Sequence, residues 1–423
     1  YHGGALTCWS VVRELIRSGH QVCVISLFDV TEGNPYLKSR GQQEAALRRE
    51  GAEVVVIEYA MEALTGARSH DPLAKFGRWI GRICSAPDGL AYLMPWVKLA
   101  EEVRRALAGR EFDGFLCYHF DALAAVHPLC LSPMLAVVGD LWHLPGYFRW
   151  REGSFSLSKY AVRGIRVALE SMIAERAMST LLASTTSCGA FAGHYAEWLK
   201  AHGFPKTLYF RTPVPDAAGP KWDLLRSEAR AGRTGGKHRV LVIGDLATTS
   251  TSSGLRAVAH AVLPRLVDEF GEDGFELRLV GGGAPPNDIA PALRKPYVCF
   301  AGRVVPADPE FLAADVMIVP TNIPLGIRVR VITAWSFGCP VVAHRANASG
   351  IPEMRHGENS LLADTDAQLV DAVLRVLTDH TLRSGLSAGG RGTFERSFSE
   401  SVAGQQIVKE MERLAGAQAT NRS

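Results

Sequence analysis

Two arginines, Arg328 and Arg330, stand where an anion could be bound. They follow a short apolar run at 316–320 that predicts a buried strand, and they open a predicted helix at 329–337. The first N–H groups of a helix have no partner within the helix, and its dipole is positive at that end. Guanidinium groups match phosphate oxygens two at a time. The spacing therefore predicts a phosphate site, with two solvated arginines as the alternative.

A second set of polar side chains follows two predicted strands of the first half. His119 comes directly after a strand at 114–118, and Asp140 and His143 follow a strand at 134–138. Ligands in open parallel sheets bind at the carboxyl ends of the strands, so these residues are candidates to orient or deprotonate a hydroxyl group. A structural histidine and a helix-capping aspartate are the alternatives.

Predicted strands and helices alternate along both halves of the chain. The strands are predicted at 21–28, 53–59, 114–118, 134–138, 180–184, 240–243, 275–280, 298–301, 316–320 and 341–343. Alternation at this spacing predicts an α/β fold with doubly wound, mostly parallel sheets. A stretch rich in proline, glycine and basic residues separates the two halves and is the predicted linker.

The composition narrows the class of protein. A chain of 423 residues is long enough for two domains of about 200 residues each. With 21% charged residues and a formal net charge of +3, it is not strongly basic, and no nucleic-acid recognition module is visible. Eight cysteines without a Cys-x-x-Cys pair predict free thiols in a reducing cytosol and no metal site.

The stretch with the arginine pair also contains other residues of a known signature. These are Pro320, Gly326, Ala334, Gly338, Pro340, Val341 and Val342. The stretch resembles the C-terminal signature of the glycosyltransferase family 4 type, the glycosyl transferases group 1 of the GT-B superfamily. The resemblance implies two Rossmann-like domains that face a central cleft, with the last helix crossing back to the N-terminal domain. Because the sequence opens where a loop should follow a first strand, we expect that strand to be missing.

This resemblance, together with the composition, predicts the domain bounds. They are 1–215 for an acceptor-binding domain, 216–238 for the linker, 239–398 for a nucleotide-sugar-binding domain, 399–414 for the crossing helix and 415–423 for a disordered tail. The small, polar residues of that tail are typical of disorder.

The resemblance also implies donor-binding positions. Gly3 and Gly4, in a loop before a helix, and Gly282, at a strand end, would let backbone amides approach the diphosphate. Arg303 occupies the place of a contact to the nucleotide base, and Glu353 lies in a loop near the donor sugar. Tight turns and solvated surface side chains are the alternative interpretations.

Two positions depart from the family pattern. Thr333 stands where the family usually has a glutamate that holds the ribose, and Leu325 stands where many members have a second acidic residue. The phosphate contacts therefore carry over from the family, with Gly326 in the same loop, whereas the ribose and sugar contacts do not.

The expected activity is transfer of a sugar from a nucleotide-diphosphate donor to an acceptor hydroxyl. The resemblance implies retention of the anomeric configuration and no metal or other cofactor. Arg328 and Arg330 would stabilise the charge on the leaving diphosphate, and His119 and Asp140 would act on the acceptor. The alternatives are a catalytically weak or inactive GT-B protein that acts as a binding partner, and a GT-B sugar-nucleotide epimerase.

The expected partners are a nucleotide sugar and a glycan, lipid-linked or small-molecule acceptor, without nucleic acid. Basic and aromatic residues interleave between 75 and 110, which predicts either contact with an anionic membrane surface or a solvated face over a packed apolar stripe. The expected location is the cytoplasm, with the inner face of the membrane as the site of any such contact.

Overall fold

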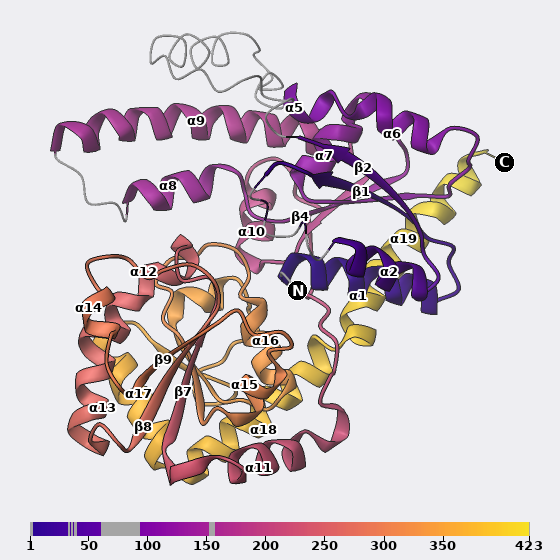
Figure 1. Cartoon of the computed structure of the whole chain (residues 1–423). Coiled ribbons are helices and arrows are strands. Elements are labelled where there is room, and N and C mark those ends of the chain that lie inside the picture. The colour runs from indigo at the N-terminus through magenta and orange to yellow at the C-terminus, as the bar shows by residue number, and fades with distance from the viewer. Residues whose placement is uncertain are drawn as a thin grey trace. The chain divides into compact units, whose positions relative to one another are not determined.

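The computed structural model describes residues 3–32, 34, 37, 40–60, 94–151 and 157–422. Contacts divide the chain into two units (Figure 1). The C-terminal unit contains Tyr1–Thr7, Ala192–His194 and Arg211–Ala403, and the N-terminal unit contains Cys8–Phe191, Tyr195–Phe210 and Gly404–Ser423. The last helix, α19 (Glu400–Arg422), therefore belongs mostly to the N-terminal unit.

The C-terminal unit is built on a six-stranded parallel sheet in the order β12-β11-β10-β7-β8-β9. Its strands are β7 (His238–Ile243), β8 (Phe275–Val280), β9 (Val298–Gly302), β10 (Val316–Val319), β11 (Val341–His344) and β12 (Leu361–Ala363). From β7 the chain builds outward through β8 to β9 and then returns to add β10 on the other side. The strand order therefore reverses between β7 and β10, the place where open α/β sheets bind ligands.

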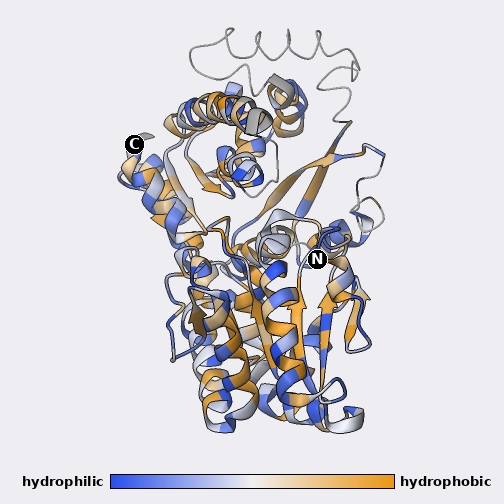
Figure 2. Ribbon diagram, turned by 90° about the vertical axis from the view of Figure 1, so that its left-hand side faces the viewer, coloured by the Kyte–Doolittle hydropathy of each residue, from blue (hydrophilic) through white to orange (hydrophobic). Residues whose placement is uncertain are grey.

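Both faces of this sheet are covered by helices. Val240 and Val242 of β7 pack into one buried hydrophobic cluster, while Leu241 between them packs into another. This double burial explains why β10 (VMIV) and β12 (LLA) contain only apolar residues, and why much of the sheet is coloured as hydrophobic in Figure 2. The covering helices are α12 (Thr249–Ala257), α13 (Leu263–Phe270), α14 (Ala290–Leu293), α15 (Asp308–Ala313), α16 (Val329–Ser336), α17 (Asp366–Thr378) and α18 (His380–Ser397).

The N-terminal unit contains a four-stranded parallel sheet in the order β3-β4-β5-β6 and a parallel pair, β1 with β2. The strands are β1 (Cys23–Asp29), β2 (Glu53–Tyr59), β3 (Phe115–Tyr118), β4 (Met134–Val138), β5 (Ser187–Ala190) and β6 (Leu208–Tyr209). Its helices are α1 (Gly3–Arg17), α2 (Arg40–Arg49), α5 (Met94–Val97), α6 (Ala100–Leu107), α7 (Phe120–Val126), α8 (His143–Arg151), α9 (Leu157–Ala183) and α10 (Gly193–Ala201). The first residues of α1 and α10 are assigned to the C-terminal unit. The predicted α/β class with parallel sheets in two domains is confirmed.

One predicted strand is wrong. The sequence at 180–184 is not a strand, because α9 continues to Ala183 and the strand that follows is β5. Burial explains the difference, since Ala174, Ala177, Met178 and Leu181 are all buried. That spacing of three and four residues continues the apolar face of a helix.

The predicted linker contains a helix, and the tail predicted to be disordered is helical as far as Arg422. The linker region contains α11 (Trp222–Ala231), whose buried Arg226 donates hydrogen bonds to the carbonyl oxygens of Phe311 and Ala314, both at 2.9 Å. It therefore packs into the C-terminal unit. The tail from 415 onward continues α19 as far as Arg422, consistent with the high helix propensity of its alanines and glutamine.

The predicted basic and aromatic face lies largely outside the described residues, which omit 61–93. Within the ranges that the structure covers, no helix combines the length and the apolar character needed to cross a bilayer.

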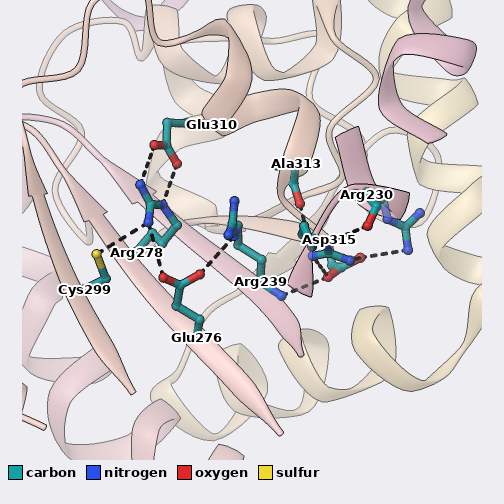
Figure 3. Close-up of polar contacts among 9 residues, drawn as sticks. Arg230, Arg239, Glu276, Arg278, Cys299, Glu310, Ala313 and Asp315 are labelled. Atoms are coloured by element: carbon teal, nitrogen blue, oxygen red, sulfur yellow. Dashed lines mark hydrogen bonds and ion pairs between the residues drawn. The ribbon is translucent and has the colours of Figure 1, made fainter. Parts of the chain in front are cut away.

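Ion pairs gather near the amino ends of the central strands in the C-terminal unit (Figure 3). Asp315, only 1% exposed, precedes β10 and accepts hydrogen bonds from Arg233 at 2.6 Å and from the backbone N–H of Arg239 at 2.8 Å, and Arg230 lies 2.7 Å away. Burial opposes ionisation of Asp315, but these partners hold its pKa below the ordinary value. Because ligands approach the opposite, carboxyl edge of such a sheet, we assign this network to stability.

Candidate active site

Arg330 lies at the carboxyl edge of the sheet, between β7 and β10. Its guanidinium donates hydrogen bonds to the carbonyl oxygen of Ile243 at 2.7 Å and to that of Ser250 at 3.2 Å. It also donates to the hydroxyl groups of Thr251 and Thr321, both at 3.1 Å. Arg330 therefore ties together the end of β7, the first turn of α12 and the loop after β10.

These four hydrogen bonds change the role expected of Arg330. The sequence predicts a side chain that reaches a diphosphate, but most of its N–H groups are already used within the protein. Burial, with the charge of Arg328 nearby, lowers the pKa of Arg330 to about 9, so it stays charged at neutral pH. Arg330 is thus a fixed positive charge that positions the loops around the site.

Arg328 is the N-cap residue of α16 and is 8% exposed. Its positive charge acts on Arg330 and on His194, whose pKa is lowered mainly by burial and additionally by Arg328. Two guanidinium groups and the positive end of α16 are therefore close together. A bound anion would relieve this repulsion between like charges.

Glycines allow the strand ends to pack tightly at this edge. A side chain on Gly244 (φ 144°) would overlap the guanidinium of Arg330, and one on Gly254 in α12 would overlap the carbonyl of Pro320. The predicted Gly282 lies at the same edge, where its carbonyl oxygen accepts a hydrogen bond from the N–H of Leu246 at 2.8 Å. Gly326, in the loop before α16, has a φ of 67° that favours glycine.

The first turn of α12 is a part of this site that the sequence analysis missed. The helix α12 begins at Thr249 with Thr248 as its N-cap residue, and neither residue is among the site residues predicted from the sequence. The Thr248 hydroxyl donates to the carbonyl oxygen of Asp245 at 2.9 Å and lies 3.0 Å from the Ser250 hydroxyl. The run of serine and threonine at 248–253 is a helix-start signal that could have revealed it.

Several predicted donor contacts are engaged within the protein. The Thr333 hydroxyl donates to the carbonyl oxygen of Val329 at 3.1 Å, one turn back along α16. Glu353 accepts a hydrogen bond from Arg211 at 2.6 Å, and Leu325 is buried. Arg303 is exposed and follows β9 directly.

Gly3 and Gly4 do not form a loop before a helix, because α1 already begins at Gly3. These two glycines are therefore in the first turn of α1, where the sequence had predicted a loop. Any backbone amide that these residues offer to a ligand would belong to a helix N-terminus.

The structure brings His119 and Asp140 to one edge of the N-terminal sheet, after β3 and β4. His119 is exposed and has a φ of 71°, a conformation that costs about 1–3 kcal/mol for a residue other than glycine. Its imidazole packs directly on Gly139, because a side chain there would overlap the ring. Asp140, the next residue, is exposed and accepts a hydrogen bond from the Tyr195 hydroxyl at 3.3 Å.

Asp121 is a further titratable group at this edge. Burial raises its pKa to about 6, although a hydrogen bond from Trp142 acts in the opposite direction. Nothing in the local sequence around Asp121 indicates this burial, which results from segments that are distant along the chain.

Replacing Asp121 by asparagine should stabilise the protein at pH 8 relative to the wild type. The native carboxyl has the higher pKa, so wild-type stability falls as the pH rises from about 4 through about 6. A pKa difference of two units corresponds to about 2–3 kcal/mol of unfolding free energy, which the wild type loses on going to pH 8 and the variant does not. Urea unfolding at pH 4 and pH 8 measures this, with the exposed Asp113→Asn as a control. The prediction would be contradicted if Asp121→Asn and the wild type differed in unfolding free energy by the same amount at pH 4 and at pH 8.

Residues 237–379 match the family model described as Glycosyl transferases group 1. Solved structures resemble the chain over nearly its whole length. A glycosyltransferase from Rickettsia africae has a TM-score of 0.61 at 11% identity, with coverage of 98% of this chain and 95% of the other. Sucrose-phosphate synthase from Thermosynechococcus elongatus has a TM-score of 0.60 at 18% identity, with coverage of 94% and 100%.

A third structure, Alr3699/HepE of Anabaena in complex with UDP-glucose, has a TM-score of 0.60 at 15% identity and coverage of 98% and 97%. No curated protein sequence matches the chain. The structures show the GT-B fold, and the family match covers β7 to α17 with both arginines. Residues 237–379, about a third of the chain, are therefore similar to the group 1 glycosyl transferases.

Proposed function

We propose that the protein moves a sugar from a nucleoside-diphosphate donor to an acceptor hydroxyl, with retention of configuration and without a metal. The observation that carries this proposal is the convergence of Arg328, Arg330 and the first turns of α12 and α16 where the strand order reverses. Positive charge and helix N-termini at this place suit a diphosphate.

The donor site would lie on the C-terminal unit. Charge builds on the leaving diphosphate as the glycosidic bond breaks, and preorganised cations stabilise that charge most. Arg328 is the candidate for direct contact, and Arg330 fixes the loops. The Anabaena structures contain UDP or UDP-glucose, which supports a uridine-type donor here.

The acceptor site would lie on the N-terminal unit, at His119 and Asp140. Both side chains are exposed at the carboxyl edge of a parallel sheet, and the packing on Gly139 fixes the imidazole. His119 would receive a hydrogen bond or a proton from the acceptor hydroxyl, and Asp140 would orient that hydroxyl.

A second candidate function is that of a binding protein with little or no turnover. The side chains of Thr333 and Leu325 favour it, because the Thr333 hydroxyl bonds within its own helix and Leu325 is buried. Neither side chain supplies the acidic group that the family resemblance would place against the donor.

Calorimetry with UDP, GDP and ADP, together with hydrolysis of UDP-glucose in EDTA or Mg²⁺, distinguishes these functions. We expect UDP to bind more tightly than the other nucleotides and hydrolysis to proceed at the same rate in both solutions. Binding without hydrolysis or transfer would favour the second candidate. Absence of binding by every nucleoside diphosphate would contradict both.

A further inference from the structure

A pocket of about 520 Å³ opens between α9 and α10 of the N-terminal unit. Its wall includes Met172, Glu175, Arg176 and Ser179 of α9, with Trp198 of α10 and the nearby His202. The volume lies within the range of small-molecule sites. The proposed donor and acceptor roles above use none of these side chains.

The aromatic side of the pocket is held rigidly. The Trp198 ring stacks on the His202 ring, with centroids 3.9 Å apart and an interplanar angle of 14°. The Nδ1 of His202 also lies 2.7 Å from the carbonyl oxygen of Trp198, at hydrogen-bonding distance. His143 of α8 approaches the Trp198 ring at 5.2 Å. The Trp198 and His202 rings therefore form the aromatic wall of the pocket, and His143 contacts Trp198 without lining the pocket itself.

One buried polar atom beside the pocket is unsatisfied, while the charged groups of its wall are open to solvent. Arg176 is exposed, the Glu175 side chain is 40% exposed, and a Glu175 carboxylate oxygen lies 3.8 Å from His143 Nε2. His143 is 9% exposed at its side chain, and its buried Nδ1 has no partner. Buried polar groups are rarely left in this state without a ligand or water.

His143 and Glu175 do not form an ion pair at neutral pH. Burial, with the charge of His202, lowers the pKa of His143 to about 4, so its imidazole is neutral. Glu175 is therefore free to accept hydrogen bonds from a ligand, while Arg176, the next residue along α9, can donate them. Adjacent groups of opposite charge favour a neutral ligand with several hydroxyl groups over an anion, and Met172 and the ring edges suit its C–H surfaces.

A chain of contacts along α10 links the pocket to the proposed acceptor edge. Tyr195 bonds to Asp140, and Trp198, three residues further along α10, contacts His143, which is three residues beyond Asp140. Three residues of a helix advance by about 4.5 Å, roughly the width of one sugar ring. We infer that this pocket binds the second sugar of a glycan acceptor whose terminal sugar lies at His119 and Asp140. This inference rests on the proposed function.

The full chain, labelled and applied to a printed array of mono-, di- and trisaccharides, tests the inference. We expect at least one disaccharide to retain the protein at least tenfold more strongly than its terminal monosaccharide does. The double variant Glu175→Gln/Arg176→Gln should lose this difference. A matched control is Glu170→Gln/Arg166→Gln, which makes the same substitutions in an exposed pair on α9, 2.8 Å apart.

The inference would be overturned if the two double variants were retained equally by the glycans. It would also be overturned if no glycan retained the wild type more strongly than Glu175→Gln/Arg176→Gln. UDP calorimetry on the same samples separates it from the proposed function. If the wild type binds UDP but Glu175→Gln/Arg176→Gln retains glycans as well as the wild type does, the pocket inference is wrong and the proposed donor stands. If Glu175→Gln/Arg176→Gln loses glycan retention but the wild type binds no UDP, the pocket inference is supported and the proposed donor is wrong.

Discussion

Arg328→Ala should lower kcat for sugar transfer by about 10²–10³-fold, the usual loss when one preorganised donor to developing charge is removed. Arg328 caps α16 at the edge where the strand order reverses, and its charge acts directly on Arg330. Removing it also removes a repulsion between like charges, so we expect the melting temperature to change little. Steady-state kinetics with a sugar-nucleotide donor and a thermal melting curve measure both effects.

Two variants control this result. Arg256→Ala removes an exposed arginine of α12 that pairs with Asp288 at 2.8 Å, and it should leave kcat unchanged. Arg328→Lys keeps the charge but not the forked geometry, so it should recover only part of the activity. Wild-type kcat in a well-folded Arg328→Ala protein would remove this arginine from the mechanism.

Asp315→Ala should lower the free energy of unfolding by about 3–5 kcal/mol, as expected when one partner of a buried ion pair is removed. The substitution leaves Arg230 and Arg233 without their carboxylate and the N–H of Arg239 without its acceptor. Chemical denaturation of the full chain at pH 7 measures the loss. Asp364→Ala breaks an exposed pair with Arg345 and should cost less than about 1 kcal/mol.

The same carboxylate gives a pH dependence. Its pKa is below the ordinary value in the native state, so its stabilisation is complete above about pH 4 and is lost as the pH falls through the native pKa. The difference between Asp315→Ala and wild type should therefore shrink in acid. A difference that stays constant from pH 7 to pH 3 would show that the Asp315 ion pairs do not stabilise the fold.

The sequence predicts best those elements whose burial is uniform along the chain. Every residue of β4 (Met134–Val138) is buried, and both its ends match the prediction. The end of α9 was harder to predict because Leu181 and Leu182 suit a buried strand as well as a helix. Their burial together with Ala174, Ala177 and Met178 indicates a helix only when the whole face is considered.

The sequence also placed the arginine pair correctly at a helix start. It could not distinguish the role of Arg330, which positions the loops, from that of Arg328, the candidate for direct contact with the diphosphate. The four acceptors of Arg330 come from segments as far as 87 residues away, so its hydrogen bonds cannot be read from local spacing. Long-range burial likewise sets the pKa of Asp121 and completes the pocket beside Trp198. The Ser/Thr run before α12, by contrast, was a local signal and was available in the sequence.

The glycines at the carboxyl edge of the C-terminal sheet also indicate where directed evolution could act. Side chains at Gly244 and Gly281 would collide with the guanidinium of Arg330 or with neighbouring backbone, whereas the nearest atom to a β-carbon at Gly282 is Asp245 Oδ2 at 3.8 Å. Libraries that diversify residue 282 would therefore retain a folded scaffold, and libraries at 244 or 281 would yield mostly misfolded clones.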